Sequence, residues 1–357
     1  MNAPFAPDHG SATTIALADV HDADLARRVG AFVEEQGGSP FHLPEWLVAI
    51  ERGTGQRACG IVAESEGCIV GWLPLTLIHS PLFGRAIVSS GFAVDGGPLA
   101  LDTGISAQMA HAASELAQRE SCAEIELRGG ETPPAWEKIT GKHSGFVCDL
   151  AEDDEAQLLA IPRKQRAEIR KSLKNDLTVR TGTSDADRAA HYDCYARSVH
   201  NLGTPVFPRS LFDAVLDIFG ERADILTVRE GDEPLASVLS LYFQGTVYPF
   251  WGGGVWRARE TRANERMYYA LMCHAREKGC TRFDFGRSKS DSGPWHYKKN
   301  WGFEPQPLAY SRWTAPGSDA RDVDPTSAAY ARKIELWKKL PLPVANRLGP
   351  MIARGLG

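Results

Sequence analysis

The sequence predicts an α/β protein built from two tandem units, each a mixed, mostly antiparallel sheet flanked by helices. Length is the first indication, because 357 residues are too many for one ordinary core and enough for two of roughly 150 residues each. The second is an internal repeat in the order of the predicted elements. Ile61 and Leu226 begin corresponding strand pairs 165 residues apart, and Cys122 and Cys280 begin corresponding later strands 158 residues apart.

Each copy of the repeat contains a strand pair, a glycine cluster, a helix and a returning strand. In the first copy these are Ile61–Ala63 with Ile69–Ile78, then Gly96 and Gly97, then 105–120, then the strand from Cys122. In the second they are Leu226–Arg229 with Leu235–Phe243, then Gly252–Gly254, then 260–278, then the strand from Cys280. The two copies are therefore expected to share one plan.

We expect the first unit at residues 15–150, a connecting pair of helices at 151–176, the second unit at 177–314 and a helical tail with a mobile start at 315–357. Residues 1–14 are expected to be a disordered leader. Pro162 divides the connection into an acidic and a basic helix. The basic helix places Arg163, Arg166 and Arg170 near one face, and we expect it to reach across the groove between the copies.

Composition excludes several classes of protein. A net charge of -5 argues against a DNA-binding protein. Seven cysteines without a CxxC pair indicate neither a disulfide framework nor a zinc site. The start of the chain lacks the pattern of a secretory signal, and Cys68–Ile78, the most apolar stretch, is too short to cross a bilayer. A cytoplasmic protein without a transmembrane segment or a metal is the expectation; its oligomeric state stays open.

The segment from Tyr248 to Tyr310 carries the densest functional signal. It contains YPFWGGG, FDFGRSKSDSG and YKKNWGFEPQP. Its three glycines allow close approach of a backbone to a ligand, and Arg287, Lys289, Lys298 and Lys299 supply positive charge. This combination predicts a binding cleft for an anion.

Three motifs resemble those of the tandem GNAT-fold acyltransferases of the FemAB type. They are FHLPEW from Phe41, YPFWGGG from Tyr248, and FDFGRS from Phe283 together with YKKNWGF from Tyr297. The sequence most resembles the FemAB-like proteins associated with exosortase and PEP-CTERM exopolysaccharide systems. The resemblance covers about residues 15–314 and implies two GNAT-like domains, a degenerate first one on the acceptor side and a second one on the donor and catalytic side. The long coiled-coil arm of some members is missing.

The resemblance implies an N-acyltransferase of the cell envelope. An activated donor, either an aminoacyl-tRNA or an acyl thioester, would pass its acyl group directly to an amine of a peptidoglycan or exopolysaccharide precursor, with no tightly bound cofactor. The stretch that begins the central helix, RARETRANERMY from Arg257, lacks the glycines that hold a CoA pyrophosphate in single GNAT enzymes. Two alternatives therefore stay open: an inactive GNAT-like module that binds partners in polysaccharide assembly, and a CoA-dependent N-acetyltransferase.

The candidate site residues fall into three groups. Asp284 is the candidate to orient the amine or accept its proton, and Lys298 or Lys299 to stabilise an oxyanion or a donor phosphate. The donor candidates are Trp251, Gly252, Gly253, Arg262, Arg287, Ser288 and Tyr297. The acceptor candidates are His42, Trp46, Asp95, Arg163, Arg166 and Arg170. Structural roles remain as alternatives: an Asp284–Arg287 ion pair, solvated lysines, a hydrogen-bonded His42, core aromatics and a simple turn at Asp95.

Overall fold

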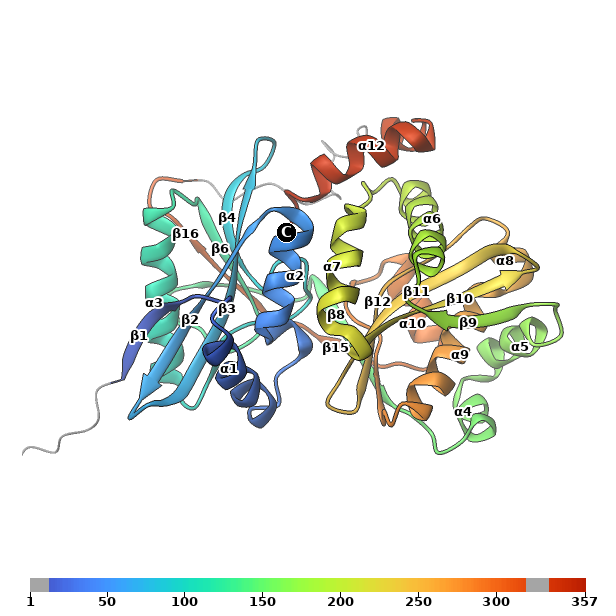
Figure 1. Cartoon of the computed structure of the whole chain (residues 1–357), viewed down its shortest axis with the longest axis horizontal. Coiled ribbons are helices and arrows are strands. Elements are labelled where there is room, and N and C mark those ends of the chain that lie inside the picture. Colours follow the sequence, from blue (N-terminus) through green and yellow to red (C-terminus); the bar gives the residue numbers. More distant parts are fainter. Residues whose placement is uncertain (1–12, 319–333) are drawn as a thin grey trace, which may run out of the picture.

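Two eight-stranded sheets form the framework of the computed structural model, which describes residues 13–318 and 334–357 (Figure 1). The expected leader therefore lies almost wholly outside the described residues, as does 319–333, the start of the expected tail. Helices cover both faces of each sheet, so the predicted α/β class is confirmed.

The first sheet has the order β1-β2-β3-β4-β6-β16-β7, with β5 added on β3. Its strands are β1 (Thr14–Ala18), β2 (Arg57–Ser65), β3 (Cys68–Ser80), β4 (Gly84–Ser89), β5 (Leu99–Ala100), β6 (Glu124–Arg128), β7 (Glu137–Ile139) and β16 (Tyr310–Thr314). Helix α3 (Thr103–Arg119) packs on β2, β3 and β6, while α1 (Ala23–Glu35) and α2 (Pro44–Thr54) contact β3, with α2 also on β2.

The second sheet has the order β14-β8-β13-β12-β11-β10-β9, with β15 added on β8. Its strands are β8 (His143–Asp149), β9 (Thr178–Gly182), β10 (Ala223–Glu230), β11 (Glu233–Phe243), β12 (Thr246–Gly254), β13 (Arg282–Asp284), β14 (Ser288–Lys289) and β15 (Pro305–Pro307). Its helices are α4 (Asp154–Ala160), α5 (Arg163–Ser172), α6 (Asp185–Leu202), α7 (Arg209–Phe219), α8 (Ala258–Thr261), α9 (Ala263–Glu277) and α10 (Gly293–Asn300), and α12 (Leu342–Ala353) lies against α6.

Two-residue turns explain why the long strands fold back as hairpins. Ser65 pairs with Cys68, and the residues between them, Glu66 and Gly67, have φ of 52° and 79°. Gln244 and Gly245 form the same kind of turn between β11 and β12, with φ of 45° and 69°. Two consecutive positive φ values match the right-handed twist of the flanking strands, so the turn fixes the register.

Each sheet contains a strand from the other half of the chain. Strand β8, in the expected first unit, pairs with β13, β14 and β15 of the second sheet. Strand β16, at the end of the expected second unit, pairs with β6 and β7 of the first. The repeat could not predict this exchange, because a short apolar strand carries no signal of which sheet edge it joins. The expected domain boundaries remain a prediction drawn from the repeat.

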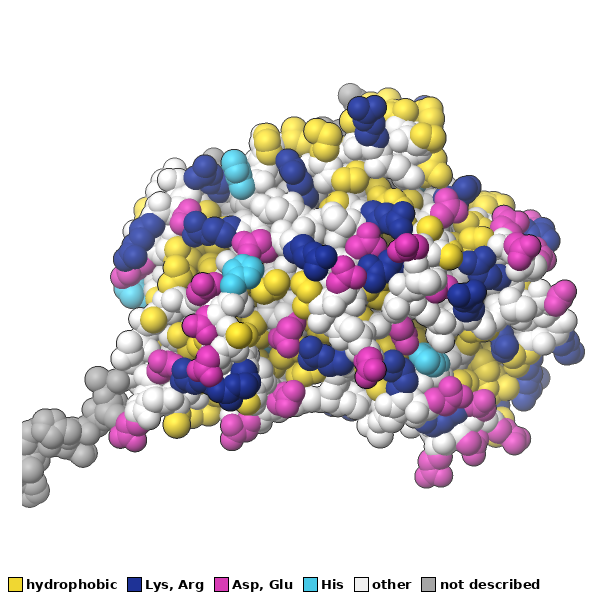
Figure 2. Space-filling view, in the orientation of Figure 1, with side chains coloured by type: hydrophobic (Ala, Val, Ile, Leu, Met, Phe, Trp, Pro, Cys, Tyr) yellow, Lys and Arg dark blue, Asp and Glu magenta, His cyan; other side chains and the backbone are white. Residues whose placement is uncertain are grey.

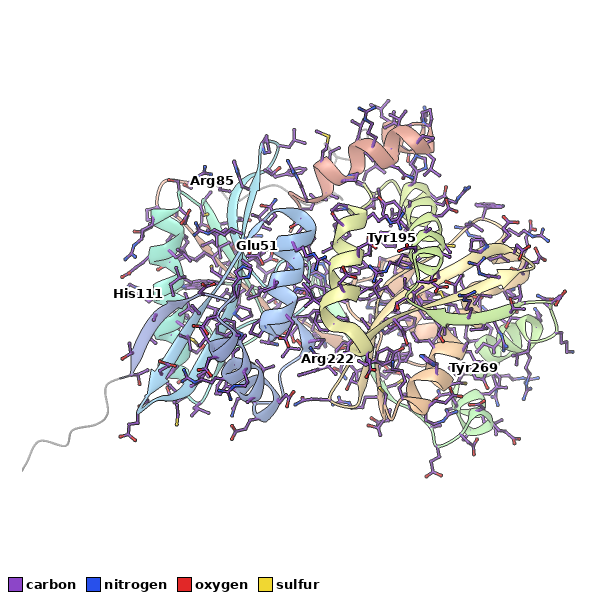
Figure 3. All side chains as sticks on the ribbon, viewed as in Figure 1. Glu51, Arg85, His111, Tyr195, Arg222 and Tyr269 are labelled. Atoms are coloured by element: carbon purple, nitrogen blue, oxygen red, sulfur yellow. The ribbon has the colours of Figure 1, made fainter. Side chains whose placement is uncertain are left out.

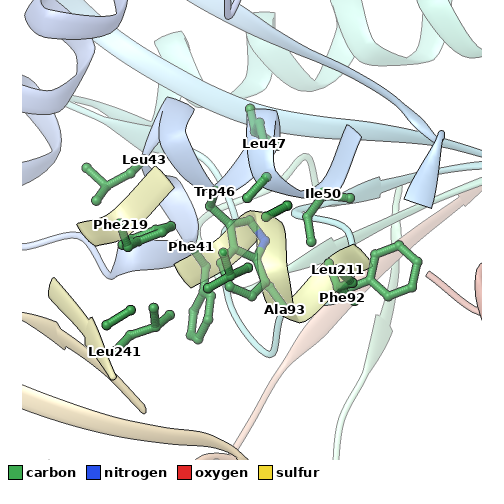
Figure 4. Packing of buried hydrophobic residues seen from close by; sticks show 14 of the residues in the cluster. Phe41, Leu43, Trp46, Leu47, Ile50, Phe92, Ala93, Leu211, Phe219 and Leu241 are labelled. Atoms are coloured by element: carbon green, nitrogen blue, oxygen red, sulfur yellow. The ribbon is translucent and has the colours of Figure 1, made fainter. Parts of the chain in front are cut away.

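A continuous aromatic core joins the two units through α2 and α7 (Figure 4). Trp46 of α2 stacks on Trp251 of β12, with ring centroids 5.8 Å apart, and Phe41 packs against Phe250 at 4.9 Å. The helices themselves approach closely, because a Cβ atom at Gly53 would lie 2.5 Å from the Cα of Leu211. Burial of large aromatic rings on both sides makes this contact resemble a domain interior.

Ion pairs surround this core at the surface. Arg222, labelled between the two units in Figure 3, donates to Glu45 of α2 at 3.1 Å, and Arg52 contacts Asp217 of α7 at 3.0 Å. Both pairs are exposed and contribute little to stability. The aromatic core therefore holds the units together.

Candidate active site

The parallel strand pair of the second sheet opens, whereas its counterpart in the first sheet stays closed. In the first sheet β4 and β6 pair over four residues, from Ala86 with Glu124 to Ser89 with Leu127. In the second, β12 and β13 pair only at Thr246 with Arg282 and at Val247 with Phe283. Beyond these pairs β12 continues along β11 while β13 ends at Asp284. The backbone groups left unpaired at this opening are available to a ligand.

Asp284 and Lys298 are both bound to the turn that follows β13. Asp284 Oδ1 accepts a hydrogen bond from the Gly286 N–H at 2.8 Å. Lys298, on α10, donates to the carbonyl oxygens of Gly286 and Arg287 at 3.1 and 3.0 Å. Its Nζ atom also lies 5.3 Å from the ring centroid of Phe146, a residue of the exchanged strand β8. The turn therefore holds a carboxylate and an ammonium group in fixed positions.

Burial shifts the pKa values of both side chains toward 7. It raises the pKa of Asp284 to about 6, an effect that Asp95 of the first unit strengthens and Lys298 opposes. Burial likewise lowers the pKa of Lys298 to about 7, against the attraction of Asp284. A carboxylate and an amine with such values can exchange protons near pH 7. Burial raises the pKa of Tyr248, at the opening of β12, and the negative charges of Asp284 and Asp95 raise it further, so both carboxyl groups lie in the neighbourhood of this hydroxyl.

A loop of the first unit, residues 90–98, faces this site and contains Asp95. We call it the acceptor loop. Four side chains outside it bind its backbone: His42 Nε2 donates to Gly97 O at 3.1 Å, Trp46 Nε1 to Gly91 O at 3.0 Å, Arg128 Nη1 to Ala93 O at 2.7 Å, and Tyr310 Oη to Val94 O at 2.8 Å. Bonds at four points along its backbone hold the loop in place, as the positioning of a substrate requires.

Arg287 joins the turn of the second unit to the acceptor loop. Its Nη1 donates to the Tyr310 hydroxyl at 2.7 Å, and that hydroxyl donates to Val94. His143 stacks on the Tyr310 ring with centroids 5.7 Å apart. Burial and the charge of Arg287 lower the pKa of His143 to about 4, which keeps its imidazole neutral at pH 7. Arg287 therefore bonds to the Tyr310 hydroxyl and also lies over the Tyr310 ring, which His143 stacks on.

His143, Arg128 and Tyr310 are site residues that the sequence reasoning missed. His143 and Tyr310 begin the exchanged strands β8 and β16, and no local pattern indicates that these two residues lie close together. Arg128 ends β6 and is only 4% exposed. A buried arginine indicates a site, but its burial is visible only in the folded sheet. A charged residue directly before Gly129 and Gly130 is the one pattern that pointed to it.

Three donor candidates lie in packed positions on β12. Trp251 is 5% exposed and its ring packs on Trp46 and Phe212. A Cβ atom at Gly252 would lie 3.1 Å from the Tyr268 hydroxyl of α9, and one at Gly253 would lie 2.6 Å from the Ser198 Cβ of α6. The glycines of this strand therefore make room for the two helices that cover it. Contact of their backbone with a donor remains a prediction.

Three further donor candidates, and the catalytic candidate Lys299, lie on or beside α9 and α10. Tyr297 of α10 lies 6.1 Å from Tyr268 of α9 between ring centroids, and its buried hydroxyl has no hydrogen-bond partner among the described residues. Ser288 is also buried, and its hydroxyl likewise has no hydrogen-bond partner among the described residues. Arg262, at the start of α9, is already paired with Glu168 at 2.5 Å. Lys299 is exposed and stacks on Trp295 at 4.8 Å, away from the turn that binds Lys298.

The basic helix α5 lies elsewhere than expected. It packs on α9 and α4, on the side of the second unit that faces away from the first (Figure 1). Arg163, Arg166 and Arg170 line a groove of about 390 Å³ there, together with Lys171 and Lys174. The helix cannot reach between the copies because Ile169 is anchored in the core of the second unit. An acceptor role for these arginines finds no support in this position, but a role toward an anion stays open.

The fold defines a class, a tandem GNAT-fold protein, and comparisons with known proteins refine it. Residues 163–299 match the family described as acetyltransferase (GNAT) domain. Over 187 residues, 46% of this chain, the sequence is 24% identical to Lipid II:glycine glycyltransferases from two strains of Staphylococcus epidermidis. That match covers 42% of the relatives, so the chain spans less than half of their length.

Solved structures share the fold over most of the chain. FemX superposes with a TM-score of 0.60 and 17% identity, covering 80% of this chain and 95% of that one. A tandem GNAT protein from the clavulanic acid biosynthesis pathway gives 0.58 and 14%, covering 86% and 100%. The predicted tandem GNAT fold is thereby confirmed. The chain is thus similar in sequence to these glycyltransferases over part of its length and similar in fold to FemX.

Proposed function

We propose that the protein is an N-acyltransferase that passes an acyl or aminoacyl group to an amine of a cell-envelope precursor. The observation that carries this proposal is that Asp284 and Lys298 both bind the turn after β13, where β12 and β13 diverge, within the electrostatic reach of Asp95 in the acceptor loop. The match to glycyltransferases and to a GNAT domain supports the same class of reaction.

The proposed reaction is a direct displacement at the donor carbonyl. The acceptor nitrogen forms a bond to the carbonyl carbon while the bond from that carbon to the donor's carrier breaks. Asp284 takes the proton that the nitrogen loses, and the Lys298 ammonium group stabilises the negative oxygen formed on the way. A proton from solvent or from the substrate completes the carrier's leaving group. Asp95 and the rigid acceptor loop hold the amine in line.

For the donor, we favour an aminoacyl-tRNA over a CoA thioester. The start of helix α9 has no glycine turn that could bind a pyrophosphate. Arg262, which caps this helix, is paired with Glu168 instead. Glu168 lies on α5, and the adjoining groove contains Arg163, Arg166 and Arg170. A run of cations beside the donor approach suits the phosphate backbone of an RNA carrier. The acceptor class, a peptidoglycan or exopolysaccharide precursor, rests on the motifs and the relatives.

A transfer assay with competing donors tests the proposal. The purified chain is incubated with a pool of aminoacyl-tRNAs or with acyl-CoA, together with amine-bearing peptidoglycan and polysaccharide precursors, and the acceptor's mass gain is recorded. We expect a gain of one aminoacyl unit from tRNA, lost in Lys298→Met. Thiol release from acyl-CoA alone would establish the CoA-dependent alternative. Binding of precursors without transfer from either donor would establish the inactive module.

A further inference from the structure

Helix α12 is packed with its small residues inward and its large apolar residues outward. Ala345, Gly349 and Ala353 are buried, and a Cβ atom at Gly349 would lie 2.9 Å from the backbone nitrogen of Val206. Val344, Leu348 and Met351 are 42%, 42% and 63% exposed, at spacings of four and three residues that put them on one face. A surface helix of a globular protein normally buries its large apolar face. This helix therefore presents an apolar stripe to its surroundings.

Neighbouring side chains extend the stripe into a patch. Leu336, in the short helical stretch 334–338, is 66% exposed, and Leu202 at the end of α6 is 61% exposed. The two segments touch, because a Cβ atom at Gly203 would lie 2.4 Å from the Cγ2 of Ile334. Figure 2 shows the apolar surface gathered over α12 at the upper edge of the molecule, with cationic side chains beside it. We call this surface the α12 patch: Leu202, Leu336, Val344, Leu348 and Met351.

The stretch of chain that carries most of the patch has an excess of positive charge. Between Leu336 and Gly357 the chain has four cations and no acidic residue: Lys338, Lys339, Arg347 and Arg354. Glu335, just before this stretch, is paired with Lys338 at 3.0 Å. This local excess of positive charge contrasts with the net charge of -5 for the whole chain. An apolar stripe bordered by cations is complementary to an anionic lipid surface.

We propose that the α12 patch docks the protein on a membrane that contains anionic lipids. With 12 residues, α12 is far shorter than the roughly 20 needed to span a bilayer, so it would lie in the plane of the interface. No helix among the described residues is long and apolar enough to cross. A second copy of the chain is a poorer occupant, since two-fold pairing would set this cationic stretch against its own copy.

The patch is linked to the acceptor loop through the residues that follow α12. Gln56 Nε2 donates to the carbonyl oxygen of Arg354 at 2.8 Å. Arg128 Nη2 donates to that of Gly357 at 2.7 Å, while its Nη1 holds the loop at Ala93. Docking would therefore fix the orientation of the acceptor loop relative to the lipid surface. The proposal concerns binding alone and does not depend on the proposed transfer reaction.

Vesicle co-sedimentation of the full chain tests the proposal. Phosphatidylcholine vesicles with and without one-quarter phosphatidylglycerol serve as probes. We expect binding to the anionic vesicles, at least tenfold weaker for the Leu348→Ser, Met351→Ser double variant because two exposed apolar side chains that would enter the lipid surface are lost. Arg347→Glu should weaken it further, and added salt should do the same. The matched control Leu101→Ser, Leu159→Ser changes two leucines that are 57% and 52% exposed at other places and should bind like the parent.

Three results would overturn the proposal. They are no binding of the parent chain to anionic vesicles, equal binding by the α12 and control variants, and a dimer in sedimentation that the α12 variant alone converts to monomer. The last result would assign the patch to self-association. Melting curves of both double variants establish that each is folded, since all four positions are exposed and should tolerate serine.

Discussion

The guanidinium of Arg287 and the hydroxyl of Tyr310 form a hydrogen bond of 2.7 Å that joins the two units at the candidate site. Arg287 follows the strand that ends at Asp284, whereas Tyr310 begins the strand that has crossed into the first sheet. Because Tyr310 in turn donates to Val94, this single hydroxyl connects the turn that holds Lys298 with the acceptor loop.

Tyr310→Phe should separate the two halves of the site while leaving the ring in place. Two hydrogen bonds are lost, one of them to a charged group, and we expect the free energy of unfolding to fall by about 1–3 kcal/mol. The KM for the acceptor should rise more than kcat falls, because the acceptor loop loses its tie to Arg287. Steady-state kinetics at varied acceptor concentration measure the split. An unchanged KM would contradict the proposed role of the loop.

Lys298 and Lys299 provide a matched pair for testing catalysis. Lys298→Met keeps the length of the side chain and removes the buried ammonium group, so kcat should fall by about 10²–10³-fold. Lys299→Met removes a solvent-exposed cation and should change kcat less than threefold. Single-turnover transfer with preloaded donor measures both. Equal losses in the two variants would argue that only the local positive charge matters.

The pH profile of kcat/KM should be narrow and bell-shaped. Asp284 has to be ionised to accept a proton, so activity should rise as pH increases through about 6. Lys298 has to be protonated, so activity should fall as pH increases through about 7. The charges of Asp95 and Arg282 also act on Asp284, and that of Arg287 acts on Lys298. The midpoints of the two limbs of the profile therefore depend on these neighbours as well. Asp284→Asn should remove the acidic limb, and a profile that keeps it would assign that limb to another group.

The same shifts predict the pH dependence of stability. The raised pKa of Asp284 contributes stability that is complete below its ordinary value of 3.8 and is lost as pH rises through about 6. The lowered pKa of Lys298 contributes stability that is present above 10.5 and is lost as pH falls through about 7. Below about pH 6 the protonated Asp284 no longer balances the buried ammonium group of Lys298, so Lys298→Met should raise the melting temperature more at pH 5 than at pH 9. Calorimetric scans from pH 5 to 9 measure this difference.

Trp46→Ala should loosen the contact between the units as a whole. The ring is fully buried between Phe41 and Trp251, so we expect a loss of about 3–5 kcal/mol in the free energy of unfolding. Trp256, which is 66% exposed, provides the control, and its replacement by Ala should cost less than about 1 kcal/mol. Urea unfolding followed by circular dichroism compares the two. Similar losses would mean that the aromatic core does not hold the units together.

Much of the fold could be predicted because local patterns determine it. The hairpin from Arg57 to Ser80 consists of two apolar runs with a turn at Glu66 and Gly67, and α3 and α9 have amphipathic periods, so their existence follows from short stretches of sequence. Asp284 and Lys298 could be named because they stand in motifs beside a strand end. The partners of Lys298 and the tie from Arg287 to Tyr310 could not, because they depend on pairings across more than a hundred residues or on burial.

The position of α5 is a feature that the sequence could not predict. Three arginines on one face correctly predict that the helix displays positive charge. Its position, however, is determined by Ile169, a single buried apolar side chain. One buried contact outweighs the charged face because burial is what orients a helix. A pattern of charges therefore predicts what a surface attracts and leaves open where that surface is.

The exchanged strands β8 and β16 make the two copies mutually dependent. A chain cut after residue 150 would deprive the second sheet of the strand between β13 and β14, and a chain that ends before Tyr310 would open the first sheet between β6 and β7. Each fragment would expose unpaired strand edges and tend to aggregate. Chimaeras that join halves of different relatives will therefore fold only where each of these two strands is kept together with the sheet that it completes.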